Sequence, residues 1–174
     1  MQSRNTIMRP IILDVEASGL GRGSYPIEVG VANTEGQVNC SIIRREPEWQ
    51  HWDPRAEILH GISREILLEH GKAPAVVATM LNEQLAGQIV YTDAWGNDSS
   101  WIALLFDAAE LPQQFRLESL RSLLSDGQVD IWHKTKEKVT AELGYTRHRA
   151  SHDALILQQT FCQTAELAQR QKVG

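Results

Sequence analysis

The sequence predicts an α/β domain in which a mixed β-sheet, three antiparallel strands followed by parallel strands, is flanked by α-helices. Three observations lead to this fold class: a short apolar run that ends in a glycine-rich turn, two β-branched runs around "NTEG", and helical and strand patterns that then alternate. Such an order of elements forms a layered fold with helices against the sheet. Ligand sites in these folds tend to lie beyond the strand ends.

The predicted strands begin near the N-terminus. "RPIILDVEASGLG", from position 9, is apolar up to Leu13 and then reaches a turn marked by Gly19 and Gly21, as a short buried strand does. "PIEVGVANTEGQVNCSIIRRE" has two β-branched runs with Gly36 at the turn between them, which predicts an antiparallel hairpin. "QIVYTDA", from position 88, predicts a later buried strand.

The predicted helices follow. Residues 47–63 are irregular and aromatic, which indicates a long loop with one short helix, and Ser63 can cap a helix over 64–70. Apolar spacing predicts helices over 75–86 and over "NDSSWIALLFDAAEL", which ends before Pro112. Helix and strand signals compete between 115 and 144, although "DIWHKTKEKVTAELG" is most simply helical. Ser151 is expected to cap a final helix over 151–171.

The whole chain has the length and composition of one soluble domain. Its 174 residues, 42% hydrophobic and 22% charged, predict a single domain over 1–174. The net charge of −5 argues against a protein that coats DNA nonspecifically, but not against an enzyme whose acidic groups hold cations. Two cysteines are too few for a cysteine-rich zinc site.

The apolar runs are short. The longest, such as "WIALLF", fall far below the roughly 20 residues that span a bilayer. "MQSRNTIMRP" lacks the apolar stretch of a secretion signal. We therefore expect a cytoplasmic protein with no membrane partner.

Two carboxylates share one face of the first strand. Asp14 and Glu16 are two residues apart on an apolar strand, so their side chains point the same way. Like charges on a buried strand repel and lose hydration, and a divalent cation such as Mg²⁺ or Mn²⁺ would compensate them. The alternative is that one or both lie at an exposed strand end.

Two further clusters follow along the chain. In "TDAWGND", Asp93 ends a strand and Asp98 lies near a helix N-terminus, where it could bind a cation or, with its neighbours in the sequence, simply cap the helix. In "HRASHDA", Asp153 falls in the first turn of the last helix, and His148 precedes it in a loop from which it could accept a proton from water. A solvated helix start is the simpler interpretation of the second cluster alone.

Taken together, these stretches resemble a known family. "LDVEASGLG" with "PIEVGVA", then "YTDAWGNDSSWIALLF", then "HRASHDA" are similar to the three motifs of the DEDDh exonucleases, also called the DnaQ-like or RNase T-like family, on a ribonuclease H-like fold. The resemblance covers residues 11 to about 160. His148, Ala150 and Asp153 match the family's H-x-A-x-x-D spacing position by position, and "LHGIS" at 59–63 resembles its H-G-I-T-like stretch.

The resemblance implies a function and a site. Asp14, Glu16, Asp98 and Asp153 would bind two divalent cations, Mg²⁺ or Mn²⁺, and His148 would be the general base. Two such cations can activate a water and stabilise the leaving 3′ oxygen. The protein would then be a 3′–5′ exonuclease that releases nucleoside 5′-monophosphates from single-stranded DNA or RNA ends.

The second motif departs from the family pattern. Asn97 stands where an aromatic residue usually precedes the Asp, which leaves Asp93 as an alternative to Asp98. A catalytically inactive nucleic-acid- or partner-binding module on the same fold is the alternative function. No acidic ligand is missing, however, which favours the enzyme. A protein partner or a homo-oligomer could supply the context for long substrates.

Four residues are candidates for holding the terminal nucleotide: Leu20, His60, Ile62 and Trp95. Apolar or aromatic side chains of this kind accept an unstacked base, although plain packing is the alternative for Ile62 and Trp95. Arg147 and Arg149 could contact phosphate or be solvated. Lys134, Lys136 and Lys138 could guide the strand or form a charged helix face. The loop around Trp49–Asp53 has no assigned role.

Overall fold

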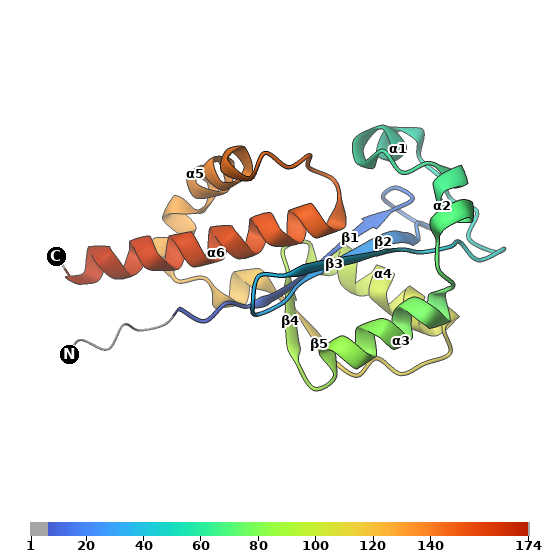
Figure 1. The fold of residues 1–174 in the computed structure, drawn as a ribbon, viewed down its shortest axis with the longest axis horizontal. Coiled ribbons are helices and arrows are strands. Elements are labelled where there is room, and N and C mark those ends of the chain that lie inside the picture. Colours follow the sequence, from blue (N-terminus) through green and yellow to red (C-terminus); the bar gives the residue numbers. More distant parts are fainter. Residues whose placement is uncertain (1–6, 174) are drawn as a thin grey trace.

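The computed structural model describes residues 7–173 and contains one five-stranded sheet in the order β3-β2-β1-β4-β5 (Figure 1). β1 (Ile11–Ala17), β2 (Pro26–Ala32) and β3 (Val38–Ile42) are antiparallel neighbours. β4 (Ile89–Thr92) runs parallel to β1, and β5 (Arg116–Ser119) runs parallel to β4. The predicted mixed sheet is therefore confirmed, and the carboxyl ends of its three parallel strands meet at one edge.

Helices cover both faces of this sheet. α6 (Ala150–Val173) packs across β1, β2 and β3, and α5 (Asp126–Leu143) packs against α6. α3 (Pro74–Leu85) and α4 (Trp95–Ala108) lie on the opposite face (Figure 1). The short helices α1 (Pro54–His60) and α2 (Arg64–His70) follow β3, and a 3₁₀ turn, η1 (Leu120–Leu123), links β5 to α5.

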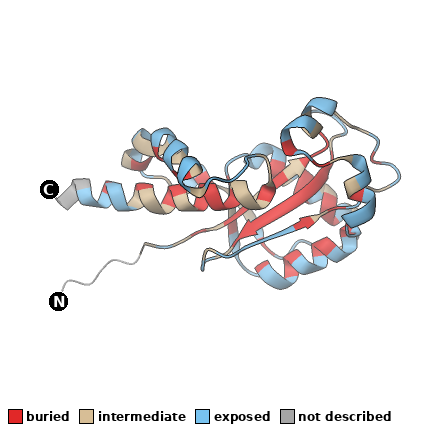
Figure 2. Cartoon of the chain, turned by 45° about the horizontal axis from the view of Figure 1, so that its top comes forward, coloured by how far each residue is buried: buried red, intermediate tan, exposed pale blue. Residues whose placement is uncertain are grey.

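The alternation of side chains along β1 separates the core into two layers. Leu13 and Val15 belong to the layer under α3 and α4, whereas Ile12 packs with Leu157 and Phe161 of α6. Figure 2 shows the central strands buried between the helices. Because side chains alternate across a strand, Asp14 and Glu16 point to the same face as Ile12, towards α6.

Most element boundaries agree with the sequence patterns, and three differ. β5 lies in the segment where helix and strand signals compete. α4 begins at Trp95, so Asp98 is inside its first turn and does not cap it. α6 begins at Ala150, so the prediction that Ser151 caps this helix is wrong. The reason is a carboxylate from β2 that binds the first helical N–H and is described below.

Within the described residues, no helix combines the length and the apolar character that a membrane crossing requires. The prediction that the N-terminus carries no secretion signal concerns a stretch whose positions 1–6 lie outside the described residues.

Candidate active site

The four predicted carboxylates and His148 gather at the carboxyl edge of β1. Asp14 and Glu16 come from β1 itself, Asp98 from the first turn of α4, and Asp153 from the first turn of α6. His148 lies in the loop just before α6. The fold thus brings together residues that are 139 positions apart in the chain, from Asp14 to Asp153.

The pKa values of the two β1 carboxylates show that the acidic residues lie close enough to one another for their charges to interact. Burial, followed by the charges of Asp98, Glu16 and Asp153, raises the pKa of Asp14 well above its ordinary value. Burial and the Asp153 charge raise the pKa of Glu16 to about 8. Burial and like charges thus outweigh the cation Arg149, which lowers the pKa of Glu16, and this is the arrangement that a bound metal ion relieves.

Asp98 and Asp93 occupy different environments at the end of β4. Asp98 is 1% exposed, and its Oδ2 accepts a hydrogen bond from the Thr92 hydroxyl. Burial raises the pKa of Asp98 to about 7 although that hydrogen bond lowers it. Asp93 instead faces α5, where its Oδ2 lies 3.3 Å from Lys136 Nζ. Asp98 also acts on Asp14 more strongly than Asp93 does.

His148 and Asp153 are tied to each other. The backbone N–H of His148 donates to Asp153 Oδ2 at 2.8 Å, and His148 has a left-handed φ of 65°. A residue other than glycine in this region stores roughly 1–3 kcal/mol of strain, which the surrounding structure must hold. Ligand atoms of Glu16, His148 and Asp153 lie within 4.8 Å of one another.

An ion pair between the buried Glu28 and the partly exposed Arg149 holds the loop that carries His148. Arg149 Nη2 donates to Glu28 Oε1 at 2.6 Å and its Nε donates to both carboxylate oxygens at 3.1 and 3.2 Å. The N–H of Ala150 donates to Glu28 Oε2 at 2.9 Å. Glu28 is wholly buried on β2, directly opposite Glu16 in the sheet. Glu28 therefore caps α6 in place of Ser151. It also holds Arg149 and Ala150, the two residues that join His148 to the helix.

The start of α6 also lies against the backbone of β2. A Cβ added at Gly30 would lie 2.3 Å from the carbonyl carbon of Ala150 and 2.3 Å from the backbone nitrogen of Ser151. Only glycine allows this approach. Glu28 and Gly30 are two residues apart on one face of β2, and the N-terminus of α6 packs on both of them.

The donor set fits divalent cations of the Mg²⁺ type. Asp153 Oδ1 is buried without a hydrogen-bond partner among the described residues, and Arg147 Nε lies 3.6 Å from it. Carboxylate oxygen is the ligand that Mg²⁺ and Mn²⁺ prefer. Asp14, Glu16, Asp98 and Asp153 are the residues that could hold such ions.

The four candidates for contact with a terminal nucleotide come from three parts of the fold. Leu20 is 71% exposed in the β1–β2 turn. His60 and Ile62 are buried, and the Ile62 N–H donates to His60 Nδ1. Trp95 is half-exposed, and its indole N–H donates to the Leu117 carbonyl of β5. In this conformation Leu20 and Trp95 present the exposed apolar surface.

The loop around Trp49–Asp53 packs on the end of β1. His51 Nδ1 lies 3.0 Å from the Ser18 hydroxyl, and the Asp53 N–H donates to the Ser18 carbonyl. The Trp49 ring stacks on Tyr25 with centroids 5.3 Å apart. This loop therefore supports the turn that carries Leu20, a role that the sequence did not reveal.

Sequence reasoning missed Thr92 and Glu28, and it named Lys136 only within a basic run and not as the partner of Asp93. The signal for Glu28 was present, because a charged residue inside the otherwise apolar "PIEVGVA" must have a partner when the strand is buried. That partner, Arg149, is 121 positions away.

No protein-family model and no curated protein matches the sequence. Solved structures do match. E. coli exonuclease I is similar with a TM-score of 0.68 at 12% identity, over 92% of this chain and 41% of that one. The same enzyme in complex with a dT13 oligonucleotide gives 0.69 at 11% identity, over 94% and 42%. Exonuclease I from Methylocaldum szegediense gives 0.57 at 14% identity, over 86% and 38%.

This chain spans about two fifths of the length of those structures. At these identities the likeness concerns the fold. The predicted ribonuclease H-like class, a mixed sheet flanked by helices, is thereby confirmed, and the sheet has five strands.

Proposed function

We propose that the chain is a single DEDDh-type exonuclease domain that removes nucleoside 5′-monophosphates from the 3′ end of single-stranded nucleic acid, with two bound Mg²⁺ or Mn²⁺ ions. One observation carries the proposal: four carboxylates and a histidine converge at the carboxyl edge of a sheet with the exonuclease I fold. Structures of exonuclease I with dA16 and dT13 oligonucleotides support a single-stranded substrate.

The residues divide the work as follows. Asp14, Glu16, Asp98 and Asp153 would hold the cations, which when bound acidify a water and stabilise charge on the departing 3′ oxygen. His148 takes the proton of the attacking water, as a general base within reach of the same oxygen ligands. The water oxygen bonds to phosphorus as the bond to the 3′ oxygen of the preceding nucleotide breaks. Glu16 also accepts a hydrogen bond from the terminal 3′ hydroxyl.

The test uses single-stranded DNA and RNA oligomers labelled at the 5′ end, incubated with Mg²⁺, Mn²⁺ or EDTA. We expect a ladder that shortens from the 3′ end, that EDTA abolishes, and that Asp98→Asn abolishes. Asp93→Asn is the matched control, because Asp93 is only five residues before Asp98 but lies outside α4 and pairs with Lys136. It should keep most of the activity.

The outcomes separate the alternatives. Loss of cleavage in Asp93→Asn but not in Asp98→Asn would reassign the ligand between them. No cleavage by the wild type, with oligonucleotide still bound, would reject the exonuclease in favour of a binding module on the same fold.

A further inference from the structure

A pocket of about 310 Å³ lies between η1 and α5, next to the carboxylate cluster. Its volume is at the lower end of the roughly 300–1,000 Å³ of small-molecule sites. The residues that line it are Asp93, Leu120, Arg121, Leu124, Val129, Trp132 and His133. We propose that this pocket binds a base of the substrate strand upstream of the nucleotide that is removed, an inference that rests on the proposed function.

The pocket lies at the same edge of the sheet as the carboxylates. β4 ends at Thr92 and β5 ends at Ser119, and the next residues of each, Asp93 and Leu120, line the pocket. Asp93 is close enough to Asp14 to raise the pKa of that carboxyl. A strand whose 3′ end reaches the carboxylates can therefore continue into the pocket.

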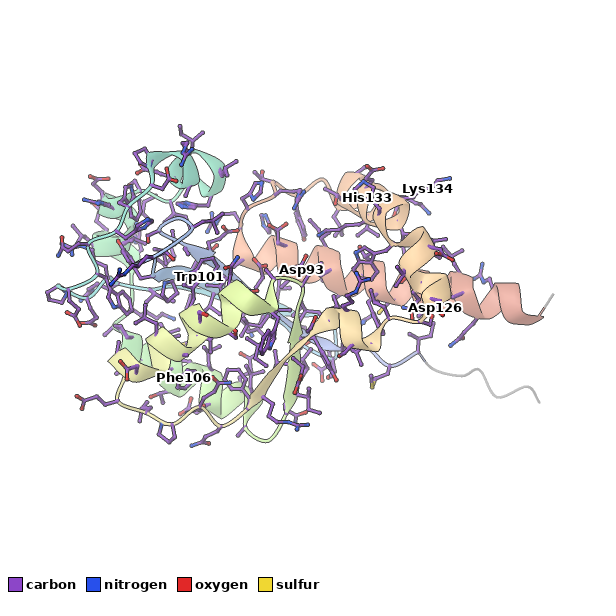
Figure 3. All side chains as sticks on the ribbon, turned by 180° about the vertical axis from the view of Figure 1, so that it is seen from behind. Asp93, Trp101, Phe106, Asp126, His133 and Lys134 are labelled. Atoms are coloured by element: carbon purple, nitrogen blue, oxygen red, sulfur yellow. The ribbon has the colours of Figure 1, made fainter. Side chains whose placement is uncertain are left out.

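One face of α5 forms the far wall. Val129, Trp132 and His133 are three or four residues apart and lie on one side of the helix. Lys136, one turn beyond Trp132, lies on this side too and pairs with Asp93. Lys134 and Lys138 point to the opposite side, because each is offset from Trp132 by about half a turn. Figure 3 labels Asp93 after β4 and His133 and Lys134 on α5.

The chemistry of the wall suits a nucleotide. The indole of Trp132 is held against the apolar layer under α6 but is only partly buried, so it offers a flat apolar surface for stacking. Arg121 is exposed at the rim and can contact a phosphate. Lys136 neutralises Asp93, which would otherwise repel the strand between the two sites. An aromatic surface beside cations, contiguous with a phosphodiester site, favours nucleic acid over a peptide.

The experiment measures the Kd of fluorescein-labelled oligothymidylates of two and six nucleotides by anisotropy, in Mg²⁺, on a His148→Gln background that slows cleavage. Trp132→Ala should weaken binding of the hexamer about tenfold and leave the dimer unchanged. Trp132→Phe should retain most of the affinity, because it keeps an aromatic ring at this position. That result would show that the pocket tolerates a substitution at position 132. A hexamer with one abasic position upstream should lose the same affinity without any change in the protein.

Two charge variants complete the test. Arg121→Gln should reduce the slope of log Kd against log salt by about 0.7, the value for one phosphate contact on a single strand. Lys134→Gln, on the opposite side of α5, is the matched control and should leave the hexamer Kd within twofold.

The outcomes distinguish this inference from the proposed function. If the wild type degrades oligonucleotides but Trp132→Ala binds dimer and hexamer as the parent does, the pocket assignment is wrong and the exonuclease stands. An equal loss for dimer and hexamer also overturns it, because that pattern marks a general defect. If the wild type cleaves nothing but binds the hexamer through Trp132, the pocket assignment stands and the exonuclease falls.

Discussion

Two ion pairs flank the carboxylate cluster and differ in their access to water. On the side of α6, Arg149 Nη2 lies 2.6 Å from Glu28 Oε1; the Glu28 side chain is 0% exposed, and that of Arg149 is 38% exposed. On the side of α5, Lys136 Nζ lies 3.3 Å from Asp93 Oδ2, with side chains that are 21% and 42% exposed. The first pair joins the start of α6 to β2, and the second joins a face of α5 to the residue that follows β4.

The difference shows that the two sides of the site are held by different means. When a buried carboxylate loses its partner, its charge is left without solvation and the fold loses stability. When an exposed charge loses its partner, water solvates it and the free energy of unfolding changes little. His148, the proposed general base, is therefore positioned through the core and has a left-handed conformation. On the other side, α5 packs on α6, and its added link to Asp93 is a charge pair that water and salt can screen.

The largest expected effect follows from breaking the buried pair. Glu28→Gln keeps the size of the side chain but removes its charge, so Arg149 loses its partner and the start of α6 loses its best acceptor. We expect the free energy of unfolding to fall by about 2 kcal/mol in urea titrations, because the buried carboxylate's charge-assisted hydrogen bonds to Arg149 and Ala150 are weakened. Displacement of His148 should lower cleavage on the order of 10²-fold, mainly in kcat.

The matched control for this variant is Arg55→Gln. Arg55 forms a two-bond pair with Asp53 of similar geometry, but its side chain is 89% exposed. It should leave both stability and cleavage unchanged within error. Equal effects of the two substitutions would show that burial is not what distinguishes the Glu28 pair.

The same contrast explains how far the sequence could predict the site. Asp14 and Glu16 are two residues apart on one strand, so local alternation alone places them together. Asp98, His148 and Asp153 depend on how α4 and α6 meet the sheet. Each was a candidate from its own stretch, but only the resemblance to a family motif joined them into one predicted site. Their convergence depends on tertiary packing, which the spacing of apolar residues within one helix or strand cannot predict.

The residues that hold the site were harder to see. Glu28 lies in a strand predicted as apolar, and its pairing with Arg149 depends on the register of β2 against α6. Lys136 looks like one member of a solvated basic run until α5 is placed beside β4. β5 has four residues with no alternation of apolar side chains, and its pairing with β4 decides its conformation.

The next effect concerns the uncompensated charge of Glu16. Its pKa is about 8 in the folded protein against an ordinary value of 4.5. Between these values the folded state binds more protons than the unfolded state, so stability is full below pH 4.5 and falls as pH rises through about 8. Glu16→Gln removes this loss and should stabilise the metal-free protein at pH 8 by about 1 kcal/mol or more.

Urea titrations in EDTA at pH 5 and pH 8 measure this difference. Glu83→Gln, an exposed glutamate on α3, is the control and should show the pH dependence of the wild type. In Mg²⁺ the order should reverse, because the wild type gains more from the cation than Glu16→Gln does. A variant that is less stable than the wild type at pH 8 in EDTA would show that Glu16 is already compensated by the protein.

The smallest effect is expected from the exposed pair, and it sharpens the comparison most. Lys136→Gln should lower the free energy of unfolding by less than about 1 kcal/mol, since both partners reach water. In 1 M NaCl this loss should vanish, whereas the loss in Glu28→Gln should persist, because salt screens exposed charges far more than buried ones.

Lys138→Gln, which breaks the exposed pair with Glu142 on the same helix, is the control and should behave like Lys136→Gln. If Lys136→Gln is instead as damaging as Glu28→Gln and insensitive to salt, α5 is fixed to the site as firmly as α6 is.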